Sequence, residues 1–343
     1  MNKVVNQLPI SYKLAVEARL QGTINEVSYC VKNYINPLRK FVTNQKINSN
    51  EVGRDKVEGE EIYKKCNVYL PCGYDEKDTT TKYNVLYLLH GVGGDRYEWL
   101  SSNGLTDGNY NICNIFDNLI AKGEIEPLII VFPEGRSAYN WTDSSFNTEG
   151  TNILGFYYFD YELRYDLIPF IEAKYKTFSN ISDKTPAGID YNRQHRAIAG
   201  LSMGGMQALN LTLGGFRCDS TSVTKTLSPW NNGLDQTVPT TGMLDLFAYV
   251  GAFSNAPTSS GGKQLGKGIN SSGYQLSLLY INCGDADEIA YQAGYENAID
   301  QLSSTAGDKL QDYYTEIIKD GLHNFEVWNH GAYNFARLVF GKK

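Results

Sequence analysis

The chain has 343 residues, of which 42% are hydrophobic and 20% charged, and its formal net charge is -7 at pH 7. This composition is that of an ordinary globular protein, and the length suits one large α/β domain with insertions or two small domains. The acidic balance, without any basic run, argues against a nucleic-acid partner. The lack of 18 consecutive apolar residues argues against a transmembrane helix and a membrane partner.

The start of the chain has a mixed composition, and we interpret residues 1–55 as an amino-terminal extension of unclear role. Within it, residues 13–21 are predicted to form a helix and residues 27–34 a strand. Residues 56–343 are predicted to form the main α/β domain. This domain opens with an alternating segment, 62–70, which ends at a proline and is therefore predicted to be an edge strand.

The rest of the chain alternates apolar segments with amphipathic ones. The apolar run 84–89 is typical of a parallel strand that is buried on both faces of a sheet. Strands are predicted at 84–89, 127–132, 197–199, 245–253, 276–283 and 313–319, and helices at 111–122, 161–175, 206–213, 289–302 and 325–340. Pro169 predicts a kink or a restart inside the second of these helices. The alternation predicts a mostly parallel central sheet with helices on both faces.

Three long loops interrupt this pattern, at 134–159, 214–241 and 255–273. Long loops at the carboxyl ends of parallel strands commonly form substrate pockets or lids. Trp141 in the first loop is a candidate stacking surface for a substrate, and Trp230 in the second is a candidate pocket wall. Packing of Trp141 against the core is an equally good interpretation.

The motif Gly200-Leu-Ser202-Met-Gly204 lies between the predicted strand 197–199 and the predicted helix 206–213. Gly-x-Ser-x-Gly at a strand-to-helix turn is the nucleophile elbow of α/β-hydrolases. Glycines are needed there because the serine takes a strained backbone conformation and side chains two residues away would collide with neighbouring elements. The turn exposes the Ser202 hydroxyl and leaves the Met203 N–H free to bind an oxyanion at the start of a helix.

A second glycine-rich stretch, His90-Gly-Val-Gly-Gly94, directly follows the strand 84–89. In this fold, a backbone N–H of that loop completes the oxyanion hole. Val92 is our candidate donor, and the neighbouring Gly91 and Gly93 are alternatives. His90 is interpreted as structural, because this fold takes its catalytic base from later in the chain.

The remaining members of a Ser-His-acid arrangement are predicted from chain order, which in α/β-hydrolases is Ser, acid, His. Acids follow the strand 276–283 at Asp285, Asp287 and Glu288, and position alone does not choose among them. Their spacing is not that of a calcium loop, and we predict no metal site. His323 follows the last predicted strand and is the candidate base. His330 lies within the closing helix and is interpreted as a packing or surface residue.

Two further observations bear on localisation. Glycosylation sequons occur at Asn140, Asn180, Asn210 and Asn270, and the chain has six cysteines, an even number. Residues 1–20 lack the apolar core of a secretory signal. We therefore expect either an intracellular protein or a secreted one whose signal peptide is absent from this chain, and the sequons and cysteine count favour secretion.

Taken together, these motifs resemble the esterase D-like group, and most closely the feruloyl and acetyl-xylan esterases of carbohydrate esterase family one. The resemblance runs in order from about Tyr63 to Phe340 and rests on the stretches Tyr87–Gly94, Arg193–Gly205, Leu246–Ser254, Cys283–Asp287 and Gly321–Trp328. It implies an α/β-hydrolase fold. In that group the acid stands three residues after the glycine that ends its strand, which selects Asp287 over Asp285.

The resemblance also implies a reaction. We expect a serine esterase, with Ser202, His323 and Asp287 as its triad, Val92 and Met203 as its oxyanion donors, and no cofactor. Feruloyl esters on plant cell-wall arabinoxylan are the expected substrate, and acetylated xylan is the close second. Alternatives are a cytosolic short-chain carboxylesterase or thioesterase, an acyltransferase, and a non-catalytic carbohydrate-binding module of the same fold. The sequence gives no protein partner.

Overall fold

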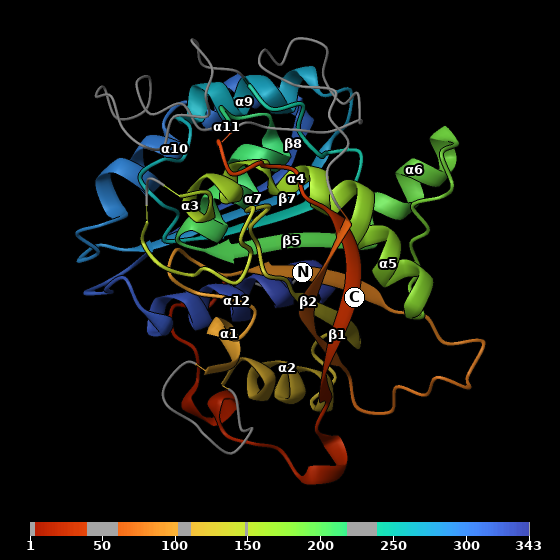
Figure 1. The fold of residues 1–343 in the computed structure, drawn as a ribbon. Coiled ribbons are helices and arrows are strands. Elements are labelled where there is room, and N and C mark those ends of the chain that lie inside the picture. The colour runs from red at the N-terminus through yellow and green to blue at the C-terminus, as the bar shows by residue number, and fades with distance from the viewer. Residues whose placement is uncertain (1–3, 40–60, 102–110, 148–149, 218–238, 343) are drawn as a thin grey trace.

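The computed structural model describes residues 4–39, 61–101, 111–147, 150–217 and 239–342. Within these ranges, eight strands form one twisted sheet in the order β1-β2-β4-β3-β5-β6-β7-β8 (Figure 1). The strands are β1 Thr23–Lys32, β2 Glu61–Leu70, β3 Asn84–Leu89, β4 Leu128–Phe132, β5 Arg196–Leu201, β6 Tyr249–Phe253, β7 Leu276–Gly284 and β8 Leu310–Ile318.

The direction of the strands divides the sheet into two parts. From β4 to β8 every neighbouring pair is parallel, whereas β2 is antiparallel to both β1 and β4. The interior strands β3, β4 and β5 are buried almost throughout, which is why, apart from Asn84 and Arg196 at their first positions, they consist of apolar residues. The predicted α/β fold with a mostly parallel sheet is confirmed.

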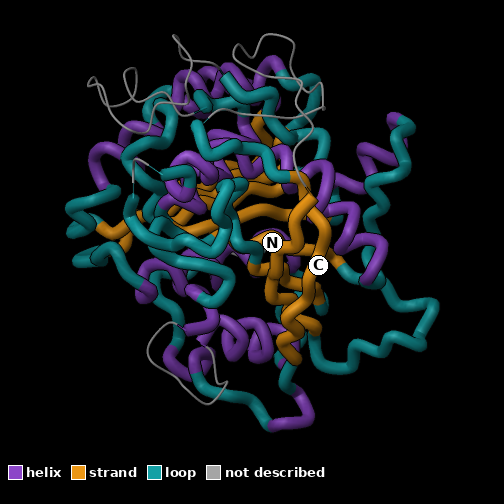
Figure 2. Tube along the Cα trace, in the orientation of Figure 1, coloured by secondary structure: helices purple, strands orange, loops and turns teal. Residues whose placement is uncertain are grey.

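Helices cover both faces of the sheet (Figures 1 and 2). The α-helices are α1 Glu98–Ser101, α2 Asn111–Ala121, α3 Asn152–Gly155, α4 Phe159–Glu162, α5 Ile168–Lys174, α6 Pro186–Arg193, α7 Met203–Leu213, α9 Gly262–Ser271, α10 Asn297–Ile299, α11 Leu302–Ala306 and α12 Phe325–Phe340. On one face, α1, α2 and α12 enclose an apolar cluster that includes Trp99, Phe116 and Phe335. On the other face, α4, α5, α7, α9 and α11 enclose a cluster that includes Leu163, Met206 and Leu265.

Two predictions near the amino terminus are wrong. Residues 13–21 do not form a helix; short 3₁₀ turns at Ile10–Lys13 and Ala18–Leu20 flank an extended segment. The strand β2 is not at the edge, because β1 pairs with it along its whole length. The proline that suggested an edge follows the last residue of β2, so it removes no hydrogen-bond donor from within the strand. Residues 23–32 of the extension therefore belong to the sheet as β1.

Two predictions in the carboxyl-terminal half also need correction. The predicted loop 255–273 contains the helix α9, whose glycines allow close packing: a Cβ at Gly262 would lie 2.2 Å from the Asp300 carbonyl oxygen. The predicted helix 289–302 is broken into a π-helical turn, Tyr291–Glu296, and α10 and α11. The break falls at Gln301, which has a φ of 57°.

The predicted helix 161–175 restarts near its proline, as expected. A π-helical turn, Leu163–Leu167, joins α4 to α5, and Pro169 occupies the first turn of α5, where its missing N–H costs no hydrogen bond. The predicted loop 134–159 ends in the helix α3 and a 3₁₀ turn, Phe156–Tyr158. No helix among the described residues is long and apolar enough to cross a bilayer.

Candidate active site

Ser202 lies at the end of β5, where the chain turns sharply into α7. Its backbone has φ 50° and ψ -115°, a conformation that residues other than glycine rarely adopt. The flanking glycines are required sterically: a Cβ at Gly200 would lie 2.4 Å from the Gly204 carbonyl carbon, and one at Gly204 would lie 2.5 Å from the His90 carbonyl oxygen. The predicted elbow is thus present, packed directly against the loop that follows β3.

Three of the predicted side chains form one hydrogen-bonded series. His323 Nε2 lies 3.0 Å from Ser202 Oγ, and His323 Nδ1 lies 2.7 Å from Asp287 Oδ2. Asp287 is fully buried, whereas the His323 side chain keeps 16% of its surface exposed. The arrangement couples the largely buried Ser202 hydroxyl to a fully buried carboxylate through an imidazole, which is the geometry for activating the hydroxyl as a nucleophile.

The loops after β7 and β8 bring the acid and the histidine together by close backbone contact. A Cβ at Gly284 would lie 2.0 Å from the Gly321 carbonyl oxygen, so the two loops could not approach with a larger residue there. The Asp285 carboxylate accepts the Asp320 N–H at 2.6 Å and thereby ties one loop to the other. Asp285 thus has a structural partner, and of the three candidate acids it is Asp287 that meets His323.

The surroundings of Asp287 keep its carboxylate ionised. Burial raises its pKa, but the hydrogen bond from His323 and the one from the Ala290 N–H, at 2.8 Å, outweigh burial, so the pKa lies below its ordinary value. The His323 ring also packs edge-on against Trp328, with 5.1 Å between ring centroids. These contacts hold the Asp287 carboxylate and the His323 ring in one orientation relative to each other.

The N–H groups predicted to bind an oxyanion come from the start of α7 and from the loop that follows β3. Met203 is the first residue of α7, so its N–H has no acceptor within the helix. In the loop 90–94, the Gly91 N–H donates to Glu98 Oε2 at 2.7 Å. No group in the described part of the chain accepts a hydrogen bond from the Val92 N–H. Of the two alternatives to Val92, Gly91 is therefore already engaged.

His90 is buried beneath this loop, in agreement with a structural interpretation. Its Nδ1 lies 2.7 Å from the Gly91 carbonyl oxygen and its Nε2 lies 2.5 Å from the Glu134 carbonyl oxygen. Burial, together with the nearby Arg136 guanidinium, lowers the pKa of His90 to about 4, so the ring is neutral at pH 7. His330 is likewise buried, between the Leu8 N–H and Glu316.

The structure describes only one of the two tryptophans that were predicted to contact the substrate. Trp230 lies outside the described residues. Trp141 is half-buried, and its carbonyl accepts a hydrogen bond from Arg136 at 3.4 Å. A residue that the sequence did not single out is Phe146, which is 67% exposed and whose ring lies 2.8 Å from where a Cβ on Gly93 would sit. An exposed aromatic ring thus lies beside the loop that carries Val92.

No three His, Cys, Asp or Glu side chains gather as a metal site would require within the described ranges. The described cysteines, which are Cys30, Cys66, Cys72, Cys113 and Cys283, are all free thiols.

Three of the four sequon asparagines are exposed, but Asn210 is buried inside α7 and its side chain donates to the Phe216 and Thr258 carbonyls.

Comparison with known sequences gives one family and two informative relatives. Residues 62–240 match the Esterase family, described as "Putative esterase". The chain is 40% identical over 143 residues to endo-1,4-beta-xylanase Y of Acetivibrio thermocellus, and 37% identical over 277 residues to an endo-1,4-beta-xylanase/feruloyl esterase of Xylanibacter ruminicola. These matches cover 42% and 80% of this chain, but only 11% and 29% of the relatives' own lengths.

Solved structures extend the likeness to the whole chain. The S954A mutant of the feruloyl esterase module from Clostridium thermocellum, complexed with sinapinate, is 25% identical and has a TM-score of 0.62, with 99% of this chain and 96% of that chain covered. A ferulic acid esterase from the anaerobic fungus Anaeromyces mucronatus has the same TM-score at 20% identity, with 98% and 97% covered. At 20% identity, the similarity to the Anaeromyces mucronatus enzyme is evidence for the fold alone.

Proposed function

The chain belongs to the Esterase family of carboxylic ester hydrolases, and from this premise we propose that it is a serine esterase that releases feruloyl groups from plant cell-wall arabinoxylan. The observation that carries the proposal is the hydrogen-bonded series of Ser202, His323 and Asp287 at the carboxyl edge of the sheet. Two relatives support the choice of a feruloyl ester: the endo-1,4-beta-xylanase/feruloyl esterase of Xylanibacter ruminicola and the feruloyl esterase module of Clostridium thermocellum.

The proposed reaction begins with attack of Ser202 Oγ on the ester carbonyl. His323 Nε2 takes the hydroxyl proton as the new bond forms, and the negative charge collects on the carbonyl oxygen. When the bond to the sugar oxygen breaks, His323 gives the proton to that oxygen, and the acyl group stays on Ser202. A water molecule then attacks the acyl carbon, again losing a proton to His323, and the free acid leaves as Ser202 is restored.

Asp287 supports this cycle through the second ring nitrogen. Its carboxylate accepts the Nδ1–H of His323, which leaves Nε2 unprotonated and facing the serine. When His323 takes a proton, the adjacent negative charge stabilises the imidazolium. We assign the oxyanion to the N–H groups of Val92 and Met203, and the loss of one such donor costs about 10²–10³-fold in kcat in other enzymes.

The acyl group of a hydroxycinnamate carries a planar aromatic ring, and this ring needs an apolar surface near the oxyanion loop. Phe146 offers such a surface, because its exposed ring packs on Gly93. An acetyl group would gain nothing from this ring. The position of Phe146 therefore favours the feruloyl substrate over the acetyl one.

The test is hydrolysis of methyl ferulate by the purified protein, with a small acetyl ester as comparison and Ser202→Ala as control. We expect ferulate turnover that falls by about 10⁴-fold or more in the variant, since loss of the nucleophile removes the covalent route. Turnover of the acetyl ester alone would move the substrate to acetylated xylan or a small ester. Absence of serine-dependent turnover of either ester would overturn the proposal.

We also propose that the enzyme is secreted, because its proposed substrate is a cell-wall polymer. The exposure of three sequon asparagines, Asn140, Asn180 and Asn270, supports this proposal. The buried Asn210 could not carry a glycan in the folded protein. Digestion of the natively produced protein with an endoglycosidase, followed by mass spectrometry, would detect modification of the exposed sites.

A further inference from the structure

The loop 90–94, which carries Val92, is held by groups from outside it. At its start, the Gly91 N–H donates to Glu98, and the Gly91 carbonyl accepts the Gly94 N–H at 3.2 Å. At its end, the Gly94 carbonyl accepts a hydrogen bond from Arg136 Nη1 at 2.5 Å. Because a peptide group is planar, fixing the Gly91 carbonyl also fixes the direction of the Val92 N–H on the same peptide.

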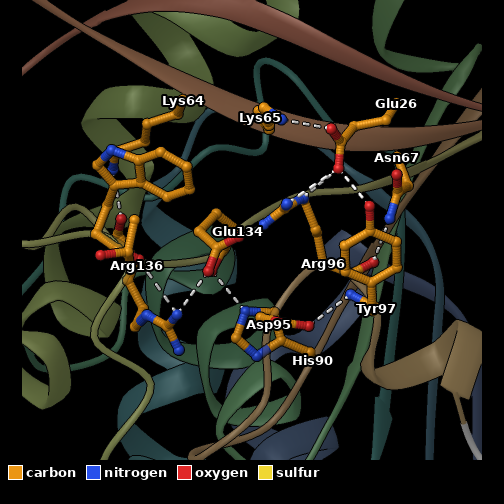
Figure 3. Close-up of polar contacts among 12 residues, drawn as sticks. Glu26, Lys64, Lys65, Asn67, His90, Asp95, Arg96, Tyr97, Glu134 and Arg136 are labelled. Carbon is orange, nitrogen blue, oxygen red and sulfur yellow. Dashed lines mark hydrogen bonds and ion pairs between the residues drawn. The ribbon is translucent and has the colours of Figure 1, made fainter.

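Arg136 is itself held by a buried carboxylate. Its Nη2 donates to Glu134 Oε1 at 2.6 Å, and both side chains are almost fully buried. The other carboxylate oxygen of Glu134 accepts a hydrogen bond from Arg96 at 3.2 Å. As Figure 3 shows, Glu134 lies between the two arginines, with His90 against its backbone carbonyl. The loop is thus connected to Arg96 through three hydrogen bonds, which join Gly94 to Arg136, Arg136 to Glu134, and Glu134 to Arg96.

Arg96 connects this cluster to the amino-terminal strand β1. Its Nε and Nη2 lie 3.1 and 3.0 Å from Glu26 Oε2, and Lys65 Nζ lies 2.7 Å from the other carboxylate oxygen (Figure 3). Tyr97 also donates to Glu26. The hydrogen bonds from Lys65 and Tyr97 lower the pKa of Glu26 to about 2, so the carboxylate is charged throughout the neutral range.

A second set of contacts reaches Arg136 from the opposite face of β1. Tyr29, also on β1, donates to Glu162 at 2.7 Å. Lys64 on β2 donates both to Glu162, at 2.7 Å, and to the Arg136 backbone carbonyl, at 2.6 Å. All three of these side chains are buried. Since successive side chains of a strand alternate between its faces, Glu26 and Tyr29 approach Arg136 from different sides.

We propose that β1 of the amino-terminal extension positions the oxyanion loop, through Glu26 and Arg96 on one face of the sheet and Tyr29 on the other. This inference rests on the proposed function, because it takes the Val92 N–H as an oxyanion donor. Glu26 and Arg96 are positioning residues: they act on the loop through Glu134 and Arg136. Glu26 also lies outside residues 62–240, the part of the chain that matches the Esterase family.

The alternative is that these ion pairs only stabilise the fold. The Glu26 side chain is 30% exposed, and exposed ion pairs add little to stability, so a purely structural role predicts almost no effect of removing the charge. A positioning role predicts a loss in kcat with KM unchanged, because the oxyanion forms after the substrate has bound. The two roles therefore separate in steady-state kinetics.

The experiment compares Glu26→Gln with a matched control, Glu61→Gln, in the full chain. Glu61 on β2 pairs with Lys32 on β1 at 2.9 Å, so the control removes an ion pair between the same two strands. For Glu26→Gln we expect kcat on methyl ferulate to fall about tenfold, a fraction of the loss from deleting a whole oxyanion donor. KM should stay within about twofold. The control should keep the wild-type kcat and KM.

A second variant and a second readout guard against misfolding. Arg96→Gln should lower kcat by a similar factor, and the double variant should fall no further, because both changes break one connection. Affinity for an arylboronic acid, which places an anionic oxygen in the oxyanion hole, should fall with kcat. If Arg96→Gln does not fold, Glu26→Gln decides the question alone.

The outcomes distinguish this inference from the function on which it rests. Wild-type turnover that depends on Ser202, together with an unchanged kcat in Glu26→Gln or an equal loss in Glu61→Gln, would overturn the positioning role alone. A loss of boronate affinity that parallels kcat, in Glu26→Gln only, would support it. If the wild-type enzyme shows no Ser202-dependent turnover, the proposed function is overturned, and this inference with it.

Discussion

Two regions of the candidate site are held in place by different means. On the nucleophile side, which consists of the elbow and the loops after β7 and β8, backbone packs directly against backbone. Gly200 lies against Gly204, and Gly284 lies against Gly321, at distances that leave no room for a Cβ. Hydrogen bonds between main-chain groups, such as the Ala286 N–H to the Gly321 carbonyl at 3.1 Å, add to these contacts.

On the oxyanion side, the loop 90–94 is held mainly by side chains. Glu98 accepts its first glycine N–H, and Arg136 donates to its last carbonyl. The residues behind Arg136 are charged, and they are spread along the chain from Glu26 to Glu162. The nucleophile side is thus held mainly by close contact between backbone atoms, with one side-chain hydrogen bond from Asp285, and the oxyanion side is held mainly by side chains.

This difference decides how each side responds to substitution. A close backbone contact tolerates no added atom, so a single methyl group should disrupt it. In a network of charged hydrogen bonds, each residue has more than one partner, so a single substitution removes only part of what holds the loop in place. We therefore expect large, abrupt effects on the nucleophile side and graded effects on the oxyanion side.

The largest expected effect comes from a change on the nucleophile side that moves no backbone. Asp287→Asn keeps the size of the side chain but places an amide opposite His323 Nδ1, which favours the wrong tautomer. We expect kcat on methyl ferulate to fall by about 10⁴-fold with KM little changed. Stopped-flow or steady-state assays at high enzyme concentration would measure the residual rate. A loss smaller than about tenfold would remove Asp287 from the proposed triad.

The same variant makes a prediction about stability and pH. The pKa of Asp287 is depressed in the folded protein, so its carboxylate contributes stability above the unfolded pKa, which is near 3.9. That contribution is lost as the pH falls through the lower, folded pKa. Below about pH 4 the free energy of unfolding of Asp287→Asn should therefore decline less steeply than that of the wild type. Urea unfolding at several pH values would test this slope.

The next substitution, Gly284→Ala, disrupts the nucleophile side by steric clash. Gly284→Ala would place a Cβ 2.0 Å from the Gly321 carbonyl oxygen, and backbone must move to relieve the clash. We expect a loss of about 3 kcal/mol in unfolding free energy. We also expect about a 10²-fold loss in kcat, because Asp287 and His323 move with their loops.

The matched control for this prediction is Gly73→Ala. Gly73 has a positive φ of 80°, but a Cβ there would meet no atom within 4 Å. Gly73→Ala should lower the unfolding free energy by only about 1 kcal/mol, because an alanine at positive φ is strained, and it should leave kcat unchanged. Equal effects of the two substitutions on kcat would contradict the claim that close loop contact positions the acid and the base.

The two sides also differ in how far the sequence could predict them. The elbow depends on residues within five positions of one another, and Gly200, Ser202 and Gly204 carry the steric requirement in their identities. The order of the strands then places Asp287 and His323 at the same edge of the sheet. Motif and chain order singled out Ser202 and His323, but they left Asp285, Asp287 and Glu288 as candidate acids, and the resemblance to a known family was needed to choose Asp287.

The support of the oxyanion loop could not be predicted in the same way. Glu26, Arg96 and Glu134 are charged residues without a local pattern, and only the pairing of β1 with β2 and of β2 with β4 brings them together. The prediction of β2 as an edge strand left no partner for β1 in the sheet. For that reason the extension had no role in the sequence-based interpretation.

The smallest expected effect comes from the exposed surface of the oxyanion side. Phe146 is 67% exposed and packs on Gly93, so its removal should cost the fold little. If the ring of a feruloyl group lies on Phe146, Phe146→Ala should raise KM for methyl ferulate by about three- to tenfold, as expected for loss of one aromatic contact. KM for a small acetyl ester should not change, since an acetyl group has no ring to pack there.

A second exposed aromatic provides the control for this last effect. Tyr191 is 52% exposed and lies on α6, which precedes β5 and so is at the opposite end of that strand from Ser202. Tyr191→Ala should leave both KM values unchanged. Equal changes in KM for the two esters in Phe146→Ala would show that the ring shapes the loop instead of contacting the acyl group. In that case Phe146 would join Glu98 and Arg136 among the side chains that hold the oxyanion loop, and the contrast between the two sides would become sharper.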